Sequence, residues 1–154
     1  MDIGHGFFKD CNNIYRLNPY NENYTLLDLP DYESFVPLRF SYSKDSQNVY
    51  LHRGLVPRAE PDSFTVLNSR YTKDRNHVFV FLGDNISVID GVHVDSFTVF
   101  KNDKSNSAYA KDMYRVYYFD DVIENASPET FQVISENQAR DGKHLFFGKN
   151  IVSS

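Results

Sequence analysis

The residues of this chain that could do acid–base chemistry recur at regular intervals. Besides Lys9-Asp10 near the N-terminus, a basic residue precedes an aspartate at four places, Lys44-Asp45, Lys73-Asp74, Lys111-Asp112 and Arg140-Asp141. Such groups act as catalytic acids and bases where their surroundings set their pKa values apart from those of their neighbours. Each pair holds the same place in a repeated stretch of sequence, so all four should share one environment. We therefore interpret the aspartates as turn residues whose carboxylates accept hydrogen bonds from nearby backbone N–H groups.

Metal binding and nucleophilic chemistry have no better support in the sequence. His77 and His144 share one position of the repeat but lie two units apart, so they should not converge on a metal ion. Cys11 is the single cysteine, and no glycine-rich phosphate loop, Gly-x-Ser-x-Gly elbow or calcium-loop pattern occurs. The sequence thus predicts no catalytic residue, no metal site and no cofactor.

The repeated stretch is plainest at Tyr71-Thr-Lys-Asp-Arg-Asn-His-Val-Phe79. Close copies run over 42–50 and 109–117, and looser copies over 7–15 and 138–146. A second landmark accompanies the first four copies: Ser34-Phe35, Ser63-Phe64, Ser96-Phe97 and Thr130-Phe131. The shortest spacing between successive aspartates, 74 − 45 = 29 residues, gives the basic unit, and longer spacings are insertions. A period of this length is typical of repeat architectures.

Each unit alternates short aromatic or β-branched runs with turn residues, which is typical of β-hairpins. The Pro-Asp/Glu-Ser/Thr-Phe stretches suit one helical turn, because proline fits an early helical position. We predict an all-β fold of about five antiparallel hairpin units, solenoid-like or a stacked meander, with single helical turns. The units form one domain over 1–154, with limits near 7–41, 42–70, 71–108, 109–137 and 138–154. Asn18 to Asp31 is interpreted as a surface loop.

Apolar residues at equivalent repeat positions should form the core. The predicted buried residues are Val49, Val78, Val116, Phe64, Phe97 and Phe131. The run from Val78 to Phe81 is apolar at every position, which indicates a strand covered on both faces. Tyr42, Tyr71 and Tyr109 could stack on a sugar, but their recurrence with the unit favours buried positions.

Composition and charge argue against several classes of protein. The 154 residues carry a net charge of −5, which argues against a nucleic-acid partner because binding the phosphate backbone needs a basic surface. No apolar stretch approaches the roughly 20 residues of a membrane helix, and the N-terminus lacks the features of a signal peptide. We therefore expect a cytoplasmic protein with no membrane partner.

The pattern Tyr-x-Lys-Asp-x-Asn-x-Val-Tyr/Phe, followed by x-Pro-Asp/Glu-Ser/Thr-Phe-x-Val, resembles the bacterial DKNYE repeat family. The resemblance extends from Phe7 to Val152, with Phe7 and Gln138 in place of the first tyrosine and Val94 in place of the proline. It implies a β-rich repeat protein of bacterial or phage origin and implies no enzymatic activity. Some small cytosolic proteins of this kind resemble immunity proteins encoded beside toxins.

Acidic residues outside the repeat consensus are the remaining candidates for function. The predicted partner-binding residues are Asp84, Asp90, Asp120, Asp121 and Glu124. These charges could form a merely solvated face, or they could meet a basic protein partner such as a toxin domain. We hypothesise a non-catalytic protein-binding module, most concretely a cytosolic immunity protein that neutralises a cognate bacterial toxin. The alternatives are a generic repeat scaffold and a small carbohydrate-binding or hydrolytic domain.

Overall fold

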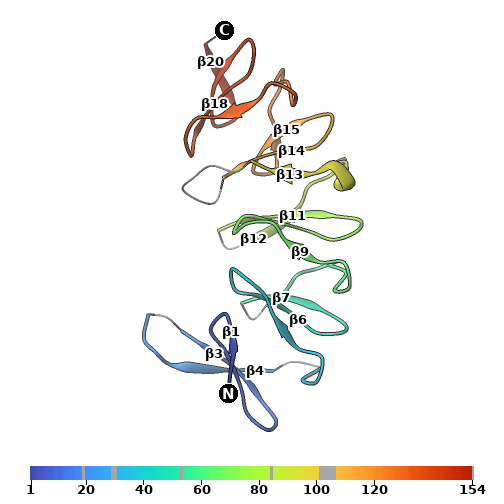
Figure 1. Cartoon of the computed structure of the whole chain (residues 1–154), viewed down its shortest axis with the longest axis vertical. Coiled ribbons are helices and arrows are strands. Elements are labelled where there is room, and N and C mark those ends of the chain that lie inside the picture. The colour runs from blue at the N-terminus through green and yellow to red at the C-terminus, as the bar shows by residue number, and fades with distance from the viewer. Residues whose placement is uncertain (19, 29–30, 53, 84, 101–106, 154) are drawn as a thin grey trace. The chain divides into compact units, whose positions relative to one another are not determined.

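The computed structural model describes residues 1–18, 20–28, 31–52, 54–83, 85–100 and 107–153. The strands of these residues form five antiparallel sheets of four strands each (Figure 1). Strands adjacent in sequence are neighbours in every sheet, so each sheet is a meander of hairpins. The prediction of an all-β fold with repeated antiparallel hairpin units is confirmed.

The chain divides into two compact units, Met1–Val66 and Leu67–Ser154. The first unit holds β1 (Asp2–Gly4), β2 (Phe7–Lys9), β3 (Ile14–Leu17), β4 (Tyr24–Leu27), β5 (Val36–Pro37), β6 (Tyr42–Lys44), β7 (Val49–Leu51), β8 (Gly54–Leu55) and β9 (Thr65–Val66). The second unit begins with β10 (Tyr71–Lys73), β11 (Val78–Leu82), β12 (Asn85–Val88) and the 3₁₀ helix η1 (Val94–Ser96). It continues with β13 (Thr98–Val99), β14 (Tyr109–Lys111), β15 (Val116–Tyr118), β16 (Asp121–Val122), β17 (Gln132–Val133), β18 (Gln138–Arg140), β19 (Leu145–Phe147) and β20 (Asn150–Ser153).

The central hairpin of each sheet is the repeated stretch itself. In the third sheet Lys73 pairs with Val78 and Tyr71 with Val80, and the backbone N–H of Asp74 donates to the carbonyl of His77 at 3.0 Å. The strand after each Ser/Thr-Phe pair joins the following hairpin, as β13 does with β14. The sheets are therefore offset from the units seen in the sequence.

Two local expectations need correction or refinement. The interpretation of Asn18 to Asp31 as a loop was wrong over β4, which pairs with β3 and buries Leu27. Its exposure alternates along Tyr24–Leu27, and this short pattern was hidden among polar neighbours. The expected helical turn is a 3₁₀ helix in the third repeat, where Val94 replaces proline. Near Pro61 and Pro128 it is a hydrogen-bonded turn.

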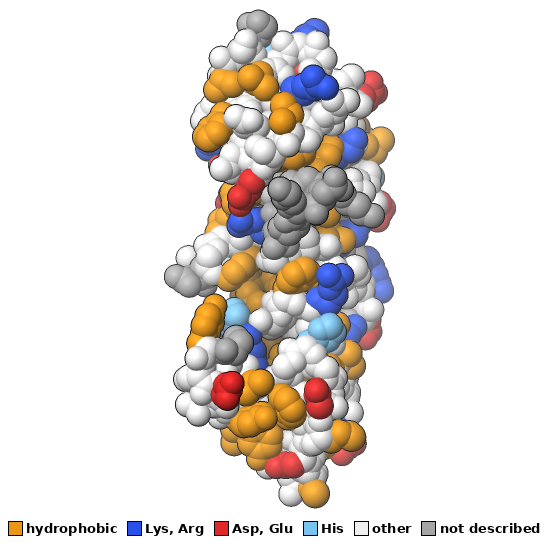
Figure 2. Space-filling model, turned by 60° about the vertical axis from the view of Figure 1, so that its left-hand side comes forward, with side chains coloured by type: hydrophobic (Ala, Val, Ile, Leu, Met, Phe, Trp, Pro, Cys, Tyr) orange, Lys and Arg blue, Asp and Glu red, His pale blue; other side chains and the backbone are white. Residues whose placement is uncertain are grey.

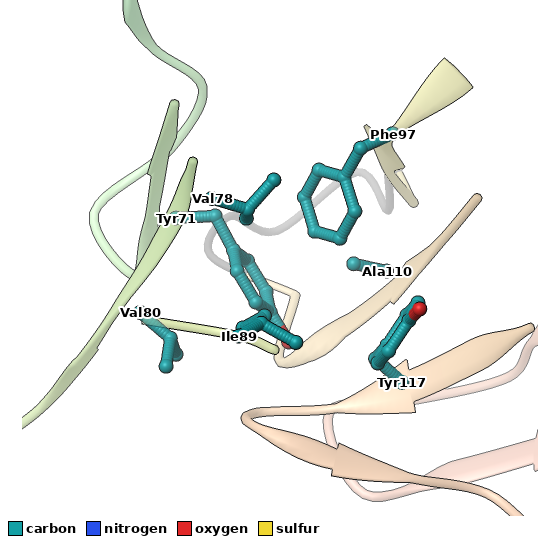
Figure 3. Packing of buried hydrophobic residues seen from close by; sticks show 7 residues of the cluster. All are labelled: Tyr71, Val78, Val80, Ile89, Phe97, Ala110 and Tyr117. Carbon is teal, nitrogen blue, oxygen red and sulfur yellow. The ribbon is translucent and has the colours of Figure 1, made fainter. Parts of the chain in front are cut away.

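Separate clusters of apolar side chains form the core. In the third repeat Tyr71, Val78 and Ile89 pack around Phe97, and Tyr117 of the next sheet closes the cluster (Figure 3). All six residues predicted to be buried are at most 6% exposed, which confirms the prediction. Tyr42, Tyr71 and Tyr109 are also buried, as predicted from their recurrence at one position of the repeat.

Candidate functional site

The repeated aspartates use both carboxylate oxygens to hold their own turns. Oδ1 of Asp112 accepts hydrogen bonds from the backbone N–H groups of Tyr114 (2.8 Å) and Arg115 (2.7 Å). Its Oδ2 accepts from the Tyr117 hydroxyl at 2.7 Å and from the backbone of His93 at 2.9 Å. The turn contacts of Oδ1 recur at Asp10, Asp45, Asp74 and Asp141. The interpretation of these aspartates as turn residues is confirmed.

His77 and His144 occur in the two repeats whose aspartate turn lacks the tyrosine donor. Tyr15, Tyr50 and Tyr117 donate to their aspartates, whereas the third and fifth repeats have phenylalanine there. In those two repeats the ring of His77 or His144 lies beside the carboxylate instead, with Nδ1–Oδ1 distances of 3.3 and 3.4 Å. Across the described residues, no three His, Cys, Asp or Glu side chains are grouped so that they could hold a metal ion.

The consensus lysines and hydroxyl residues bind backbone as well. Nζ of Lys44 donates to the carbonyl of Pro61 at 2.6 Å, and Nζ of Lys111 donates to that of Pro128 at 2.7 Å. The Ser96 hydroxyl accepts the backbone N–H of Met113 at 3.0 Å, just after the next repeat's aspartate. Ser34 and Thr130 do the same for Ser46 and Gly142. The lysines thus join each hairpin to the turn of its own repeat, and the hydroxyls join that turn to the following hairpin.

The buried tyrosines connect successive sheets of the second unit. The Tyr71 hydroxyl donates to the carbonyls of Ala108 (2.5 Å) and Phe119 (3.0 Å), and the Tyr109 hydroxyl donates to that of Gly148 (3.1 Å). Burial raises the pKa of both tyrosines well above the ordinary value. They are neutral structural donors, so residues outside the consensus are better candidates for binding.

Residues outside the consensus line a groove of about 590 Å³ in the second unit. Its walls are the turns that follow β11, β15 and β19, which are equivalent turns of three successive repeats. We call it the turn groove, and the residues that matter below are Arg70, Leu82, Tyr118, Phe119, Asp120, Asp121, Phe147 and Lys149. Aromatic rings and both signs of charge meet there.

Phe119 holds an unusual backbone conformation in this groove. Its φ is +54°, and the equivalent turns after β11 and β19 have glycine, with φ of +78° at Gly83 and +58° at Gly148. A bulky side chain in the left-handed region is strained, whereas glycine is not. The Tyr71 hydroxyl bonds the Phe119 carbonyl and holds the turn. Retained strain of this kind occurs at functional sites, and here it places an aromatic ring in the groove.

The charges of the turn groove are partly neutralised within it. The Arg70 guanidinium lies 4.8 Å from the centre of the Phe119 ring and 3.6 Å from Glu136. Lys149 pairs with Asp121 at 2.8 Å. Asp120 is exposed and has no ion-pair partner among the described residues. Its carboxylate is accessible to a cation of a partner.

The predicted acidic residues separate into different environments. Asp120 and Asp121 lie in the turn groove, while Asp90 and Glu124 are exposed in turns after β12 and β16 and do not line it. Asp84 lies outside the described residues. Sequence reasoning missed the aromatic and basic residues Arg70, Tyr118, Phe147 and Lys149. The aromatic pair Tyr118-Phe119, at a turn where the two neighbouring repeats have glycine, was the signal available in the sequence.

A smaller hollow of about 380 Å³ lies in the first unit. The Arg16 guanidinium crosses it, with Nη1 2.6 Å from Nδ1 of His52 and Nη2 donating to the Ser41 hydroxyl at 2.6 Å. Burial and the nearby Arg16 charge lower the pKa of His52. His52 holds the turn position of Phe119 and also has a positive φ, of +54°. In both units a side chain strained at this position lines a hollow.

Comparison with known proteins gives a family. The model of the DKNYY family matches residues 7–150, which include all five copies of the repeated stretch. No curated protein and no solved structure matches the chain. None of the helices in the described part of the chain is long and apolar enough to span a membrane.

Proposed function

Because the chain belongs to the DKNYY family, a close relative of the predicted DKNYE family, and its repeat residues hold turns and core, we propose that it acts by binding another protein. The proposed binding site is the turn groove. The observation that carries the proposal is Phe119, whose ring is kept in a strained turn where the neighbouring repeats use glycine.

The composition of the groove suits a protein interface. Aromatic residues and arginine provide most of the binding energy in such interfaces, and Phe119, Phe147 and Arg70 lie together here. Phe147 is 52% exposed, so its ring is available to a partner. Asp120 adds a carboxylate that can select a partner with a basic residue. The groove thus combines two of the acidic residues predicted from the sequence, Asp120 and Asp121, with aromatic and basic residues.

The most concrete form of the proposal is an immunity protein that binds and neutralises a cognate bacterial toxin in the cytoplasm. A toxin that acts on nucleic acid presents a basic surface, and the chain's net charge of −5 favours association with it. Such a protein should bind one partner tightly. A generic scaffold would instead bind several partners weakly.

Co-expression with the product of the adjacent reading frame tests the proposal. We expect that product to be toxic alone, to be tolerated with the wild-type chain, and to bind it with a nanomolar Kd. Phe119→Gly should keep the free energy of unfolding within about 1 kcal/mol, because glycine relieves the strained turn. It should also weaken binding at least about tenfold and impair rescue.

One matched control variant is needed to interpret the result. Asp90→Lys changes an exposed carboxylate outside the groove and should rescue growth as the wild type does. A neighbour that is harmless or does not bind would refute the immunity proposal. A bound toxin indifferent to Phe119→Gly would instead refute the groove as the binding site.

A further inference from the structure

Arg16 links the first sheet to the second across the hollow of the first unit. In the second unit buried tyrosines make such links, with hydroxyls that donate to backbone carbonyls. Phe7 stands at the tyrosine position of the first repeat and has no hydroxyl. Arg16 of β3 instead contacts the side chains of Ser41 and His52, which flank the hairpin of β6 and β7. A charged side chain therefore takes the part that a neutral hydroxyl has in the second unit.

Three side-chain acceptors of this hollow are engaged within the protein. Nδ1 of His52 and Oγ of Ser41 each accept from Arg16 at 2.6 Å. Oδ1 of Asn18 accepts the backbone N–H of Tyr20 at 2.9 Å. What these side chains can still offer to a ligand is therefore mainly hydrogen-bond donors.

The donors of the hollow follow from the same contacts. Because Arg16 can only donate, Nδ1 of His52 is the acceptor and the ring hydrogen lies on Nε2. The Ser41 hydroxyl accepts from Arg16, so its own hydrogen can be donated. Thr25, which pairs with Arg16 between β3 and β4, adds a second hydroxyl. A guanidinium also carries more N–H groups than the contacts with Ser41 and His52 use.

The charge of the hollow is opposite to that of the chain. The net charge is −5, and acidic side chains are scattered over the face shown in Figure 2. Among the described residues that line the hollow, Arg16, His52 and Tyr20 can ionise, and none is an aspartate or glutamate. Burial and the Arg16 charge lower the pKa of His52, and a bound anion would offset that charge. A hollow with this charge and these donors suits an anion.

The backbone conformation keeps both partners of Arg16 at the hollow. The φ angles of Ser41 and His52 are +67° and +54°, in the left-handed region that residues with a Cβ rarely adopt. Backbone strain of this kind is concentrated at ligand-binding and catalytic sites.

We propose that this hollow binds the phosphate group of a small phosphorylated molecule. A phosphate ester presents three strong acceptor oxygens. The donors here come from β3, β4 and the turn after β7, through Arg16, Thr25 and His52. A carboxylate has fewer oxygens and would use fewer of these donors. The hollow shares no described residue with the turn groove, so the inference does not depend on the proposed function.

Titration of the full-length protein with inorganic phosphate, followed by NMR of the His52 ring, tests the proposal. We expect saturable binding with a Kd of about 1 mM or tighter, which chloride at the same ionic strength does not reproduce. Phosphate should also raise the pKa of His52, because a bound anion favours the protonated ring. Phenyl phosphate should perturb the same ring, and acetate should bind at least about tenfold more weakly.

Three variants assign the binding to the hollow. Arg16→Gln should weaken phosphate binding at least about tenfold. Arg39→Gln is the matched control and should bind as the wild type does, because Arg39 is an exposed arginine of the same unit that does not line the hollow. Thr25→Val keeps the Arg16 charge and should weaken binding at least about threefold. It decides the matter if Arg16→Gln does not fold.

Four results would overturn the inference. They are the absence of saturable phosphate binding, binding that Arg16→Gln and Thr25→Val leave unchanged, an equal loss in Arg39→Gln, and acetate binding as tight as that of phosphate.

Discussion

At the scale of single residues, one hydrogen bond distinguishes the two kinds of aspartate turn. We expect Tyr117→Phe to destabilise the protein by about 1.5–3 kcal/mol, because it removes a hydroxyl donor from the buried Asp112 carboxylate. Urea denaturation would measure the change in the free energy of unfolding. Adding Arg115→His should recover part of the loss, since the third and fifth repeats pair histidine with phenylalanine. An unaffected single variant would show that the bond contributes nothing.

Two buried side-chain hydroxyls lack a hydrogen-bond partner among the described residues. The side-chain hydroxyls of Ser43 and Thr72 are buried and have no hydrogen-bond partner in the described part of the chain, and the equivalent residues of the fourth and fifth repeats are Ala110 and Ala139. Ser43→Ala should therefore stabilise the fold by about 1 kcal/mol. Ser107→Ala is the contrasting variant and should destabilise, because the Ser107 hydroxyl accepts the backbone N–H of Tyr109. Thermal unfolding of both variants decides whether the unpaired hydroxyl is costly.

The acid response of the fold follows from the same aspartates. Burial raises the pKa of Asp112, but hydrogen bonds from His93, Tyr117 and the turn backbone more than offset it, so the pKa lies below its ordinary value. The carboxylate thus contributes stability that is complete above the unfolded pKa of about 3.9 and is lost as the pH falls through the folded pKa.

We expect Asp112→Asn to lower stability at pH 7 and to reduce the loss of stability between pH 5 and pH 3. Urea midpoints measured across that range for both proteins provide the comparison. Identical slopes against pH would exclude Asp112 as a source of the acid sensitivity.

At the scale of the elements, a turn phenylalanine is buried in the core of each of the first four repeats. Phe97 is 1% exposed, and its ring centre lies 5.6 Å from that of Tyr71 and 5.9 Å from that of Tyr117. Phe97→Ala should cost about 3–5 kcal/mol, as aromatic truncations in cores do. Phe147→Ala, at a half-exposed ring, should cost much less. Equal urea midpoints for the two variants would contradict this packing.

Much of this architecture could be predicted from the sequence, because the same hairpin motif, with its turn aspartate, occurs five times. Val78, Phe97 and their equivalents keep constant spacing, so their burial followed from the period alone. Strand β4 could not be predicted, since it lies in an insertion without a repeated counterpart. The offset of sheets from sequence units was also hidden, because the pairing of β13 with β14 depends on contacts beyond the repeated stretch.

The candidate site was predictable only in part. Asp120 and Asp121 were identified by charge, but the pairing of Asp121 with Lys149 depends on turns 28 residues apart in sequence. The role of Phe119 depends on its backbone conformation, which composition does not specify. That Asp90 lies outside the groove likewise could not be predicted without the fold.

In the whole molecule, the repeated scaffold is distinct from the turn groove, the surface that we propose for binding. Consensus residues hold the turns, connect the sheets and fill the cores, so substitutions there should act through stability. Residues of the turn groove have fewer structural roles, so their substitution should act on binding. Asp120 represents the second class most clearly, because it is exposed and without an ion pair in the described structure.

The most direct test is the rate of association with the toxin-like partner, measured by stopped flow at several salt concentrations. Asp120→Lys should slow association and weaken its dependence on salt, because a groove charge that attracts a basic partner is reversed. Asp90→Lys, the same change at an exposed residue outside the groove, should leave the rate close to that of the wild type. Equal effects of the two variants, or no effect of Asp120→Lys at low salt, would contradict binding through the turn groove.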